Sequence, residues 1–509
     1  MRRLLVLFGD QLDKRYLSDA GLQKERDAIA LFEVVSESRH VPSHFQRTVL
    51  FLSAMRHFAS ALREDEWRVH YVKIDDEDNT GALDGEISRA IGLLAPEQLV
   101  FVYPGEIRVR NIVEYVARNT SIPHVVLSDS HFLTELTEFD HWASGRSEMR
   151  MGHFYREQRR RLGILVDDSG SPEGGRWNYD KENRKRFSAA PHVPEFPAFT
   201  PDATTQTVVR TVRSMLPDLP GFKAGFQWPV TRGQWLSLLE HFVRERLPRF
   251  GDYEDAMWED ETILFHSGLS AGLNLKLLSP REVVDAALSE YADGHAPLNA
   301  IEGFVRQVIG WREFIRGVYW HEGAGYRDRN DLEQRGRLPW FYWDGDSDME
   351  CMRDVLHSVL TRGYAHHIAR LMVTGNFALI AGVRPQEVAD WYLGMFVDGI
   401  DWATLPNVLG MTMFADGGVV ASKPYAASGK YINRMSNYCT RCAYDVRVRT
   451  GERACPFSVF YWDFLFRNEY RFDAIPRMAL MARTARRIGV TERDAIVSAA
   501  DRLRARFGI

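Results

Sequence analysis

Short apolar runs alternate with amphipathic stretches over the first 130 residues of the chain. The apolar residues from Val49 to Leu62 recur at the spacing of one helix face, and the runs around them have the length of strands. The runs of strand length are 4–8, 29–35, 68–74, 99–103 and 124–127. Strands that alternate with helices form a parallel sheet with helices on both faces. We therefore predict a Rossmann-like α/β domain over 1–130, although the chain has no GxGxxG dinucleotide fingerprint.

The pattern changes twice further along the chain. Charged residues, Gly, Pro and Ser predominate from 131 to 227, which is typical of a connection between domains. This stretch carries basic clusters at Arg160 and Arg184, and taken alone each cluster is more simply a solvated face. From 228 to 509 apolar residues recur at helical spacing, so we predict a large all-α domain there.

Composition narrows the class of protein. Hydrophobic residues make up 45% of the chain, enough for large cores, and no apolar run approaches the length of a membrane span or a signal peptide. The formal net charge of -5 argues against a protein that is basic all over, but a local positive stripe can still bind DNA. We expect a monomeric cytoplasmic protein.

The four cysteines are distributed unevenly. Cys439, Cys442 and Cys455 lie close together in the sequence, and Cys351 precedes them by a wide interval. Four cysteines are too few for a secreted disulfide scaffold of this size, so they predict a metal site. Their spacing alone leaves zinc and an iron–sulfur cluster equally open.

A loop rich in Gly and Ser, FHSGLSAGL at 265–273, precedes Ser279-Pro280, which can start a helix. Small residues let the backbone approach a ligand closely, and such a loop can hold a diphosphate, although most Gly/Ser loops are only connections. Three more segments follow in order, and they carry more information together than the loop does alone. These are Trp311-Arg312-Glu313-Phe314, the stretch from Met352-Arg353 to Gly363-Tyr364-Ala365-His366-His367-Ile368-Ala369-Arg370, and Phe396-Val397-Asp398-Gly399.

With the loop, these segments resemble the flavin-phosphate loop, the WREF helix, the MRxLxxTGYxHxxxR segment and the flavin-side acidic position of the photolyase and cryptochrome family. The resemblance implies that 228–509 is a helical FAD-binding domain in which Arg370 and Asp398 form an ion pair beside the isoalloxazine. The residues implied to line the cofactor are Tyr253, His266, Ser267, Gly268, Leu269, Ser270 and Gln307.

The cysteines and the segment 175–184 resemble those of the bacterial iron–sulfur photolyases, also called proteobacterial cryptochromes. That branch implies a 4Fe-4S cluster on Cys351, Cys439, Cys442 and Cys455, within an iron–sulfur region at 430–509. It also implies a 6,7-dimethyl-8-ribityllumazine antenna in the N-terminal domain. The candidates for contacting this antenna are Asp10, Glu37 and Phe51.

The chain departs from ordinary photolyases in two places. Their tryptophan chain does not map here, so Trp391, Tyr392 and Trp343 are the candidates for electron transfer to the flavin, against the alternative of ordinary core aromatics. The residue that faces flavin N5 is Thr404 by an ungapped match, whereas Asn407 is the better polar candidate.

The function that the resemblance implies is light-driven repair of (6-4) pyrimidine photoproducts by an electron from excited reduced FAD. His367 stands where (6-4) photolyases have His and cyclobutane-dimer photolyases have Asn, so we expect it to donate a proton, with His366 as a second catalytic candidate. The second histidine of eukaryotic (6-4) enzymes is Leu371 here. The residues expected to contact UV-damaged DNA are Arg160, Arg184, Trp311 and Tyr425.

Two other functions fit the same sequence. A cryptochrome of this architecture would act as a blue-light photoreceptor with a signalling partner, and a light-independent electron carrier would need no DNA groove.

Overall fold

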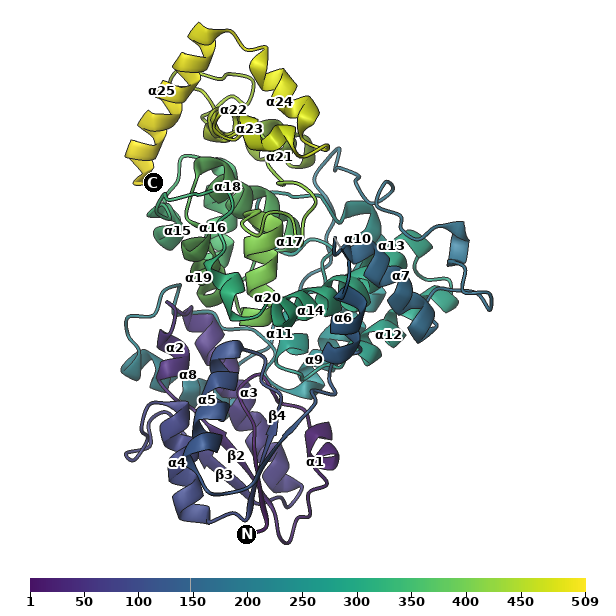
Figure 1. Ribbon diagram of the computed structural model, residues 1–509, viewed down its shortest axis with the longest axis vertical. Helices are drawn as coiled ribbons and strands as arrows, with labels where there is room; N and C mark the ends of the chain where they lie inside the picture. Colours follow the sequence, from purple (N-terminus) through teal and green to yellow (C-terminus); the bar gives the residue numbers. More distant parts are fainter. Residues whose placement is uncertain (147) are drawn as a thin grey trace.

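The computed structural model describes residues 1–146 and 148–509. Its N-terminal part contains a five-stranded sheet in which all neighbouring strands are parallel, in the order β3-β2-β1-β4-β5 (Figure 1). The strands are β1 (Arg3–Val6), β2 (Ala28–Phe32), β3 (Val69–Val72), β4 (Gln98–Val102) and β5 (His124–Leu127). All five predicted strands are therefore confirmed, as is the parallel sheet.

Helices cover both faces of this sheet. They are α1 (Arg15–Asp19), α2 (Ser36–Arg39), α3 (Phe45–Glu64), α4 (Leu83–Leu94) and α5 (Ile107–Asn119). Successive side chains of a strand point to opposite faces. Leu5 of β1 accordingly packs into the core that contains α3, and Leu4 and Val6 pack into the core that contains α4 and α5.

The stretch 131–227 contains three helices, α6 (Leu136–Ala143), α7 (Met151–Leu162) and α8 (Ala203–Met215). Phe154 of α7 is fully buried in the largest core of the helical part, and Val208 and Val212 of α8 are fully buried against α3. A few apolar residues among many charged ones are enough to dock these helices. The stretch thus contributes to two cores, the largest core of the helical part and the core that contains α3. The division of the chain into three domains stays a prediction.

Beyond 228 the described residues form no strand of the sheet and are mostly helical. The α-helices are α9 (Arg232–His241), α10 (Leu247–Tyr253), α11 (Ser270–Asn274), α12 (Pro280–Ala292), α13 (Leu298–Val305), α14 (Glu313–Glu322), α15 (Phe341–Asp344), α16 (Glu350–Arg362), α17 (His367–Ala369), α18 (Asn376–Ala381), α19 (Pro385–Met395), α20 (Asp401–Leu405), α21 (Gly429–Met435), α22 (Pro456–Arg467), α23 (Glu469–Asp473), α24 (Ala479–Arg486) and α25 (Val490–Phe507). Thr231 and Ser279 form capping boxes at α9 and α12, where the sequence predicts helix starts. The all-α prediction is confirmed.

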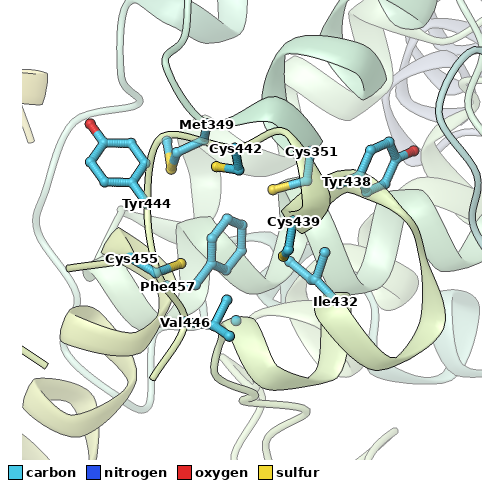
Figure 2. Close-up of a pocket in the computed structure, with 11 residues that line it drawn as sticks. Met349, Cys351, Ile432, Tyr438, Cys439, Cys442, Tyr444, Val446, Cys455 and Phe457 are labelled. Atoms are coloured by element: carbon cyan, nitrogen blue, oxygen red, sulfur yellow. The ribbon is translucent and has the colours of Figure 1, made fainter. Parts of the chain in front are cut away.

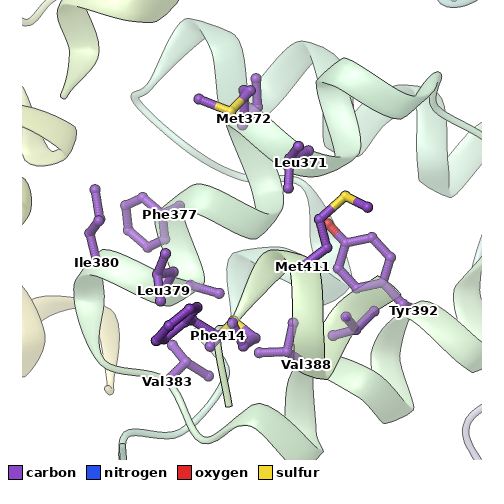
Figure 3. Packing of buried hydrophobic residues seen from close by; sticks show 14 of the residues in the cluster. Leu371, Met372, Phe377, Leu379, Ile380, Val383, Val388, Tyr392, Met411 and Phe414 are labelled. Atoms are coloured by element: carbon purple, nitrogen blue, oxygen red, sulfur yellow. The ribbon is translucent and has the colours of Figure 1, made fainter. Parts of the chain in front are cut away.

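A dense apolar core holds the helices of this part together. Figure 3 shows Phe377 of α18 and Phe414 among the side chains of this cluster, and Phe377 is fully buried. The α/β part and the C-terminal helices lie at opposite ends of the molecule, with the remaining helices between them (Figure 1). No helix in the described ranges is both long enough and apolar enough to span a membrane.

Four π-helical turns interrupt the α-helices, η2 (Phe242–Arg246), η3 (Arg306–Arg312), η5 (Arg370–Gly375) and η6 (Pro406–Thr412). π-Turns are rare and concentrate at functional sites because they re-aim side chains. Gln307, Arg370 and Asn407, all implied to lie at the flavin, fall in three of these turns. The positions of these π-turns and the sequence motifs thus indicate the same region of the helical part.

Candidate functional site

Arg370 and Asp398 form the expected ion pair in the middle of the helical part. The guanidinium Nη1 and Nη2 atoms of Arg370 each donate to one carboxylate oxygen of Asp398 at 2.9 Å. Burial alone would lower the pKa of Arg370, but the Asp398 carboxylate outweighs it and raises this pKa. Ser270 adds a hydrogen bond from its Oγ to Asp398 at 2.5 Å, which joins the Gly/Ser loop to the pair.

Two buried histidines from distant segments stack beside this pair. The rings of His266 and His366 lie 4.4 Å apart between centroids and are tilted by only 14°. Burial lowers the pKa of His266 to about 3 and that of His366 well below its usual value, so both rings are neutral at pH 7. His266 Nε2 and His366 Nδ1 are buried without a hydrogen-bond partner among the described residues. Unpartnered buried nitrogens are costly, which indicates that a polar ligand belongs here.

His367 has a different environment from its neighbour. Its side chain is exposed to solvent at the start of α17, yet burial by the surrounding protein and the adjacent Arg370 lower its pKa to about 4. His367 is thus accessible to solvent and lies close enough to Arg370 for the guanidinium charge to act on it. We call His266–Ser270, His366, His367, Arg370 and Asp398 the Arg370–Asp398 site.

The other residues expected around the flavin fall into two groups. Gly268 has φ of +67°, and a Cβ atom there would lie 2.8 Å from the Phe196 ring, so only glycine fits. The backbone N–H of Leu269 donates to Ser267 Oγ at 3.3 Å, which shapes the same loop.

Tyr253 and Gln307 form the second group, next to Glu254. Tyr253 stacks on Phe187 with centroids 4.3 Å apart, and Gln307 Nε2 donates to Glu254 Oε1 at 2.8 Å. Burial raises the pKa of Glu254 to about 7, and the backbone of Glu254 hydrogen-bonds His266, which places this group beside the Arg370–Asp398 site.

Neither candidate for the position facing flavin N5 stands out by its contacts. Asn407 is half-buried, and its Nδ2 donates to the backbone oxygen of Ala403 at 2.7 Å. Thr404 is buried.

Aromatic rings connect this site to the surface through Trp391. Trp391 is fully buried and lies 5.0 Å from Tyr392 and from Tyr342 between ring centroids. Tyr392 donates from its hydroxyl to the backbone oxygen of Arg370 at 2.7 Å and stacks on Phe396, over which the Arg370 guanidinium lies at 4.1 Å. Two residues that the sequence did not single out complete this series. Tyr342 connects Trp391 with Trp343, and Phe396 connects Tyr392 with Arg370.

Trp343 lies at the outer end of this series. It follows Tyr342 directly in α15, and 37% of its surface is exposed. Phe396 could have been found from its position two residues before Asp398 in the matched motif. Tyr342 lies between Phe341 and Trp343, and nothing in that run of aromatics distinguishes it from a core residue.

The four cysteines surround one hollow, as Figure 2 shows. Cys351 belongs to α16, Cys439 to a short 3₁₀ turn, and Cys455 immediately precedes α22. All four thiols are free, and the space they line has apolar walls that include Phe457 and Val446.

The four thiols line one space and come from separate segments of the chain. Thiolates are ligands of both zinc and iron–sulfur clusters. Among the described residues, no three His, Cys, Asp or Glu side chains lie as close together as the ligands of one metal ion. Gly429 supports close packing here, because a Cβ at this position would lie 2.8 Å from Cys455 Sγ.

The candidate antenna residues lie on the α/β part where it meets the helical part. Asp10 is half-buried, one of its carboxylate oxygens is buried without a hydrogen-bond partner in the described ranges, and burial raises its pKa. Lys276 of the helical part approaches Asp10 at 3.5 Å, and Arg108 binds Glu37 through two hydrogen bonds of 2.7 Å. The Phe51 ring lies 4.7 Å from the guanidinium of Arg47.

The candidate DNA contacts lie on different elements of the fold. Arg160 of α7 lies over the Trp177 ring at 4.7 Å. Arg184 is 65% exposed and approaches Asp255 at 3.8 Å. Tyr425 is partly exposed, and burial raises its pKa while Arg184 acts on it electrostatically, which places these two near each other. Trp311 is half-buried in η3.

Comparison with known proteins identifies the class. Residues 5–228 match the family described as deoxyribodipyrimidine photo-lyase-related protein. The chain is 45% identical to a (6-4) photolyase of Agrobacterium fabrum over 479 residues, which cover 94% of each chain. The chain therefore belongs to the photolyase and cryptochrome family, and membership of this family implies a bound flavin.

Two solved structures share the fold. A bacterial class III photolyase from Agrobacterium tumefaciens aligns with a TM-score of 0.56 at 14% identity, covering 85% of this chain and 86% of its own. A cryptochrome of Synechocystis sp. PCC6803 aligns with a TM-score of 0.55 at 11% identity, covering 86% and 88%. Both confirm the combination of an α/β part with a helical part.

Proposed function

We propose that this chain repairs (6-4) pyrimidine photoproducts in DNA with light. The observation that carries the proposal is the placement of His367, exposed to solvent beside Arg370 of the Arg370–Asp398 pair. The relative named (6-4) photolyase supports the same activity.

The Arg370–Asp398 site fits a flavin in its chemistry. When bound, reduced FAD supplies an electron under blue light. Arg370 presents a positive charge that Asp398 fixes in place, and the stacked pair His266 and His366 has two free nitrogens for a polar group. Because both rings are neutral, they can accept or donate hydrogen bonds without adding charge.

His367 is the residue that holds and moves the proton. Transfer of a hydroxyl or amino group between two bases requires a proton donor, which splitting a cyclobutane ring does not. In the free protein Arg370 and burial keep His367 neutral at pH 7. A negatively charged ligand bound beside His367 would raise the pKa of His367, so that substrate binding itself prepares the proton donor.

The lesion must leave the duplex to reach this site, because the Arg370–Asp398 pair lies inside the helical part. Flipping a damaged dinucleotide costs less than flipping an intact one. Arg184, which is 65% exposed, and Tyr425 would contact the DNA backbone, and Trp311 can form a wall for the flipped bases. Arg160 lies on α7 and would contact a separate part of the backbone.

Two further groups complete the proposal. A 4Fe-4S cluster fits the hollow between Cys351, Cys439, Cys442 and Cys455, because the thiols face one space without converging on a point. A ribityl-lumazine antenna is assigned to the region of Asp10, Glu37 and Phe51, where the buried free oxygen of Asp10 offers an acceptor.

The experiment is a repair assay on defined lesions with the His367→Asn variant. We expect (6-4) repair to fall by about 100-fold or more, because general acid catalysis typically contributes 10² to 10⁴. Flavin content and binding to damaged DNA should be unchanged. His295→Asn, an exposed histidine in another part of the fold, is the control and should repair normally.

Native (6-4) repair by His367→Asn would overturn the assigned role. A wild-type protein that binds flavin and responds to light without repairing either lesion would instead favour the photoreceptor.

A further inference from the structure

A hollow that neither candidate site uses opens at the surface beside Trp391. It has a volume of about 410 Å³ and lies where α15, α19 and the end of α25 meet. Its walls include Trp340, Trp343, Trp391 and Arg337. This volume is within the range of small-molecule sites, which are usually lined by aromatic side chains and a few placed polar groups.

The aromatic walls are unusual because two of them face water. Trp340 is 46% exposed and Trp343 is 37% exposed, whereas Trp391 has no exposed surface and closes the hollow from inside. Exposed indoles grouped around a hollow mark a binding surface for apolar or planar groups. The hollow therefore has stacking surfaces for planar rings.

The charges of the hollow leave one cation free. Asp390 pairs with Arg327, and Glu387 pairs with Arg384 at 3.1 Å. Within 1–146 and 148–509, no hydrogen bond or ion pair occupies the guanidinium of Arg337. An unpaired guanidinium at a pocket rim favours phosphate or another anion, which it can bind with two parallel hydrogen bonds.

The floor of the hollow is also one end of the aromatic series. Trp391 contacts Tyr392, and Tyr392 and Phe396 contact Arg370 of the Arg370–Asp398 site. Any electron that leaves Trp391 or Trp343 for the flavin site must be replaced from solution. The hollow is where a donor would lie closest to both indoles.

We propose that this hollow binds a reduced pyridine nucleotide, with its planar rings against Trp340 and Trp343 and its diphosphate on Arg337. This inference rests on the proposed function. It further assumes that light-driven reduction of the flavin passes through Trp391. In the step, an indole oxidised to its radical cation takes one electron from the dihydronicotinamide, which also releases one proton to water. The resulting nicotinamide radical reduces a second oxidised protein molecule, so that one NADH ends as NAD⁺ after two transfers.

The first test measures binding in the dark with the flavin-loaded full chain. NADH is titrated while its fluorescence is excited through protein tryptophans. We expect saturable binding that Arg337→Gln weakens about tenfold, the loss typical of a hydrogen bond to a charged group. Trp340→Ala should also weaken it, and Arg335→Gln, an exposed arginine two residues away that does not line the hollow, should leave it unchanged.

The second test measures the rate of flavin reduction under blue light, which NADH does not absorb. The rate should saturate with NADH concentration, and Arg337→Gln should raise the half-saturating concentration about tenfold without changing the limiting rate. With uncharged dithiothreitol as reductant, Arg337→Gln should match the wild type.

A rate that rises linearly with NADH, or dark binding that ignores Arg337, would overturn the site. Failure of the proposed function gives a different result. If Trp391→Phe reduces its flavin at the native rate while NADH still binds at Arg337, the electron route is wrong and the binding site remains.

Discussion

The hollow between the four cysteines and the Arg370–Asp398 site both belong to the helical part, but their polar groups are stabilised in different ways. At the Arg370–Asp398 site each charge has a protein partner, since Arg370, Asp398 and Ser270 satisfy one another. The residues that line the cysteine hollow include no charged partner, and its thiols face one another and mostly apolar walls. The first site can exist without its ligand, whereas the second depends on what it holds.

Cys351→Ala should have the largest effect. Metal-binding free energy becomes folding free energy when a site joins distant segments, so this variant should lose the fold of the C-terminal helices. We expect a loss comparable to the whole stability of a domain, on the order of 5 kcal/mol or more, together with loss of bound iron. Thermal unfolding followed by circular dichroism, with metal analysis, measures both.

Met349→Ala is the matched control, because it removes a lining side chain of the same hollow and leaves all four thiols. It should lose about 2 to 5 kcal/mol and keep its iron. Stoichiometric zinc in the wild type would contradict the cluster.

Asp398→Asn should have an intermediate effect, on ligand more than on fold. It leaves the Arg370 charge without its carboxylate, so flavin affinity should fall at least tenfold while the helical signal is kept. The free energy of unfolding should drop by about 1 to 3 kcal/mol. Equilibrium dialysis of FAD and denaturant unfolding provide the two readouts.

Asp285→Asn breaks an exposed pair with Arg281 and should change neither quantity measurably. If Asp398→Asn unfolds the protein as completely as Cys351→Ala does, the two sites do not differ in the way described.

Trp391→Phe should change a rate with little effect on stability. Phenylalanine keeps most of the packing against Tyr342 and Tyr392 but is much harder to oxidise, so light-driven flavin reduction should slow at least tenfold. Trp320→Phe, which lies against Tyr103 and outside the aromatic series, should reduce its flavin normally. Transient absorption of the flavin after a light pulse measures the rate, and an unchanged rate would rule out this route.

Glu254→Gln should have an effect on stability that grows with pH. Burial raises the pKa of Glu254 to about 7 in the folded protein, above an unfolded value of about 4.3. The folded state therefore binds this proton more tightly, and the stability it adds is present below pH 4 and is lost as the pH rises through 7.

The Glu254→Gln variant should accordingly be more stable than the wild type by about 3 kcal/mol at pH 8 and by only about 1 kcal/mol at pH 5. Urea unfolding at the two pH values tests this, with Glu290→Gln, at the partly exposed end of α12, as the control. An unchanged difference between pH 5 and 8 would show that Glu254 is not perturbed.

The sequence predicts elements well where a pattern is local. The five strands and the starts of α9 and α12 follow from periodicity and from capping residues that act within one turn. The contribution of α7 to the core was not predictable in this way, because Phe154 is hidden among arginines and glutamates.

The residues of the Arg370–Asp398 site were predictable only where they belong to a matched motif. The Arg370–Asp398 pair follows from two matched segments. The stacking of His266 on His366 depends on tertiary packing between a loop and a helix start that are 100 positions apart. The contacts of Lys276 with Asp10 and of Phe396 with Arg370 have no sequence signal for the same reason.

The distribution of the cysteines along the chain has a consequence during protein synthesis. Every residue of the Arg370–Asp398 site leaves the ribosome before Cys439, and the first cysteine, Cys351, waits for partners that follow much later. Because domains generally fold in the order in which they emerge, the flavin-side helices can form while three of the four cysteines are still missing. If the cysteines hold the proposed iron–sulfur cluster, its loading is a late step in biogenesis, and the supply of iron and sulfide at that moment sets how much newly made chain reaches its final form.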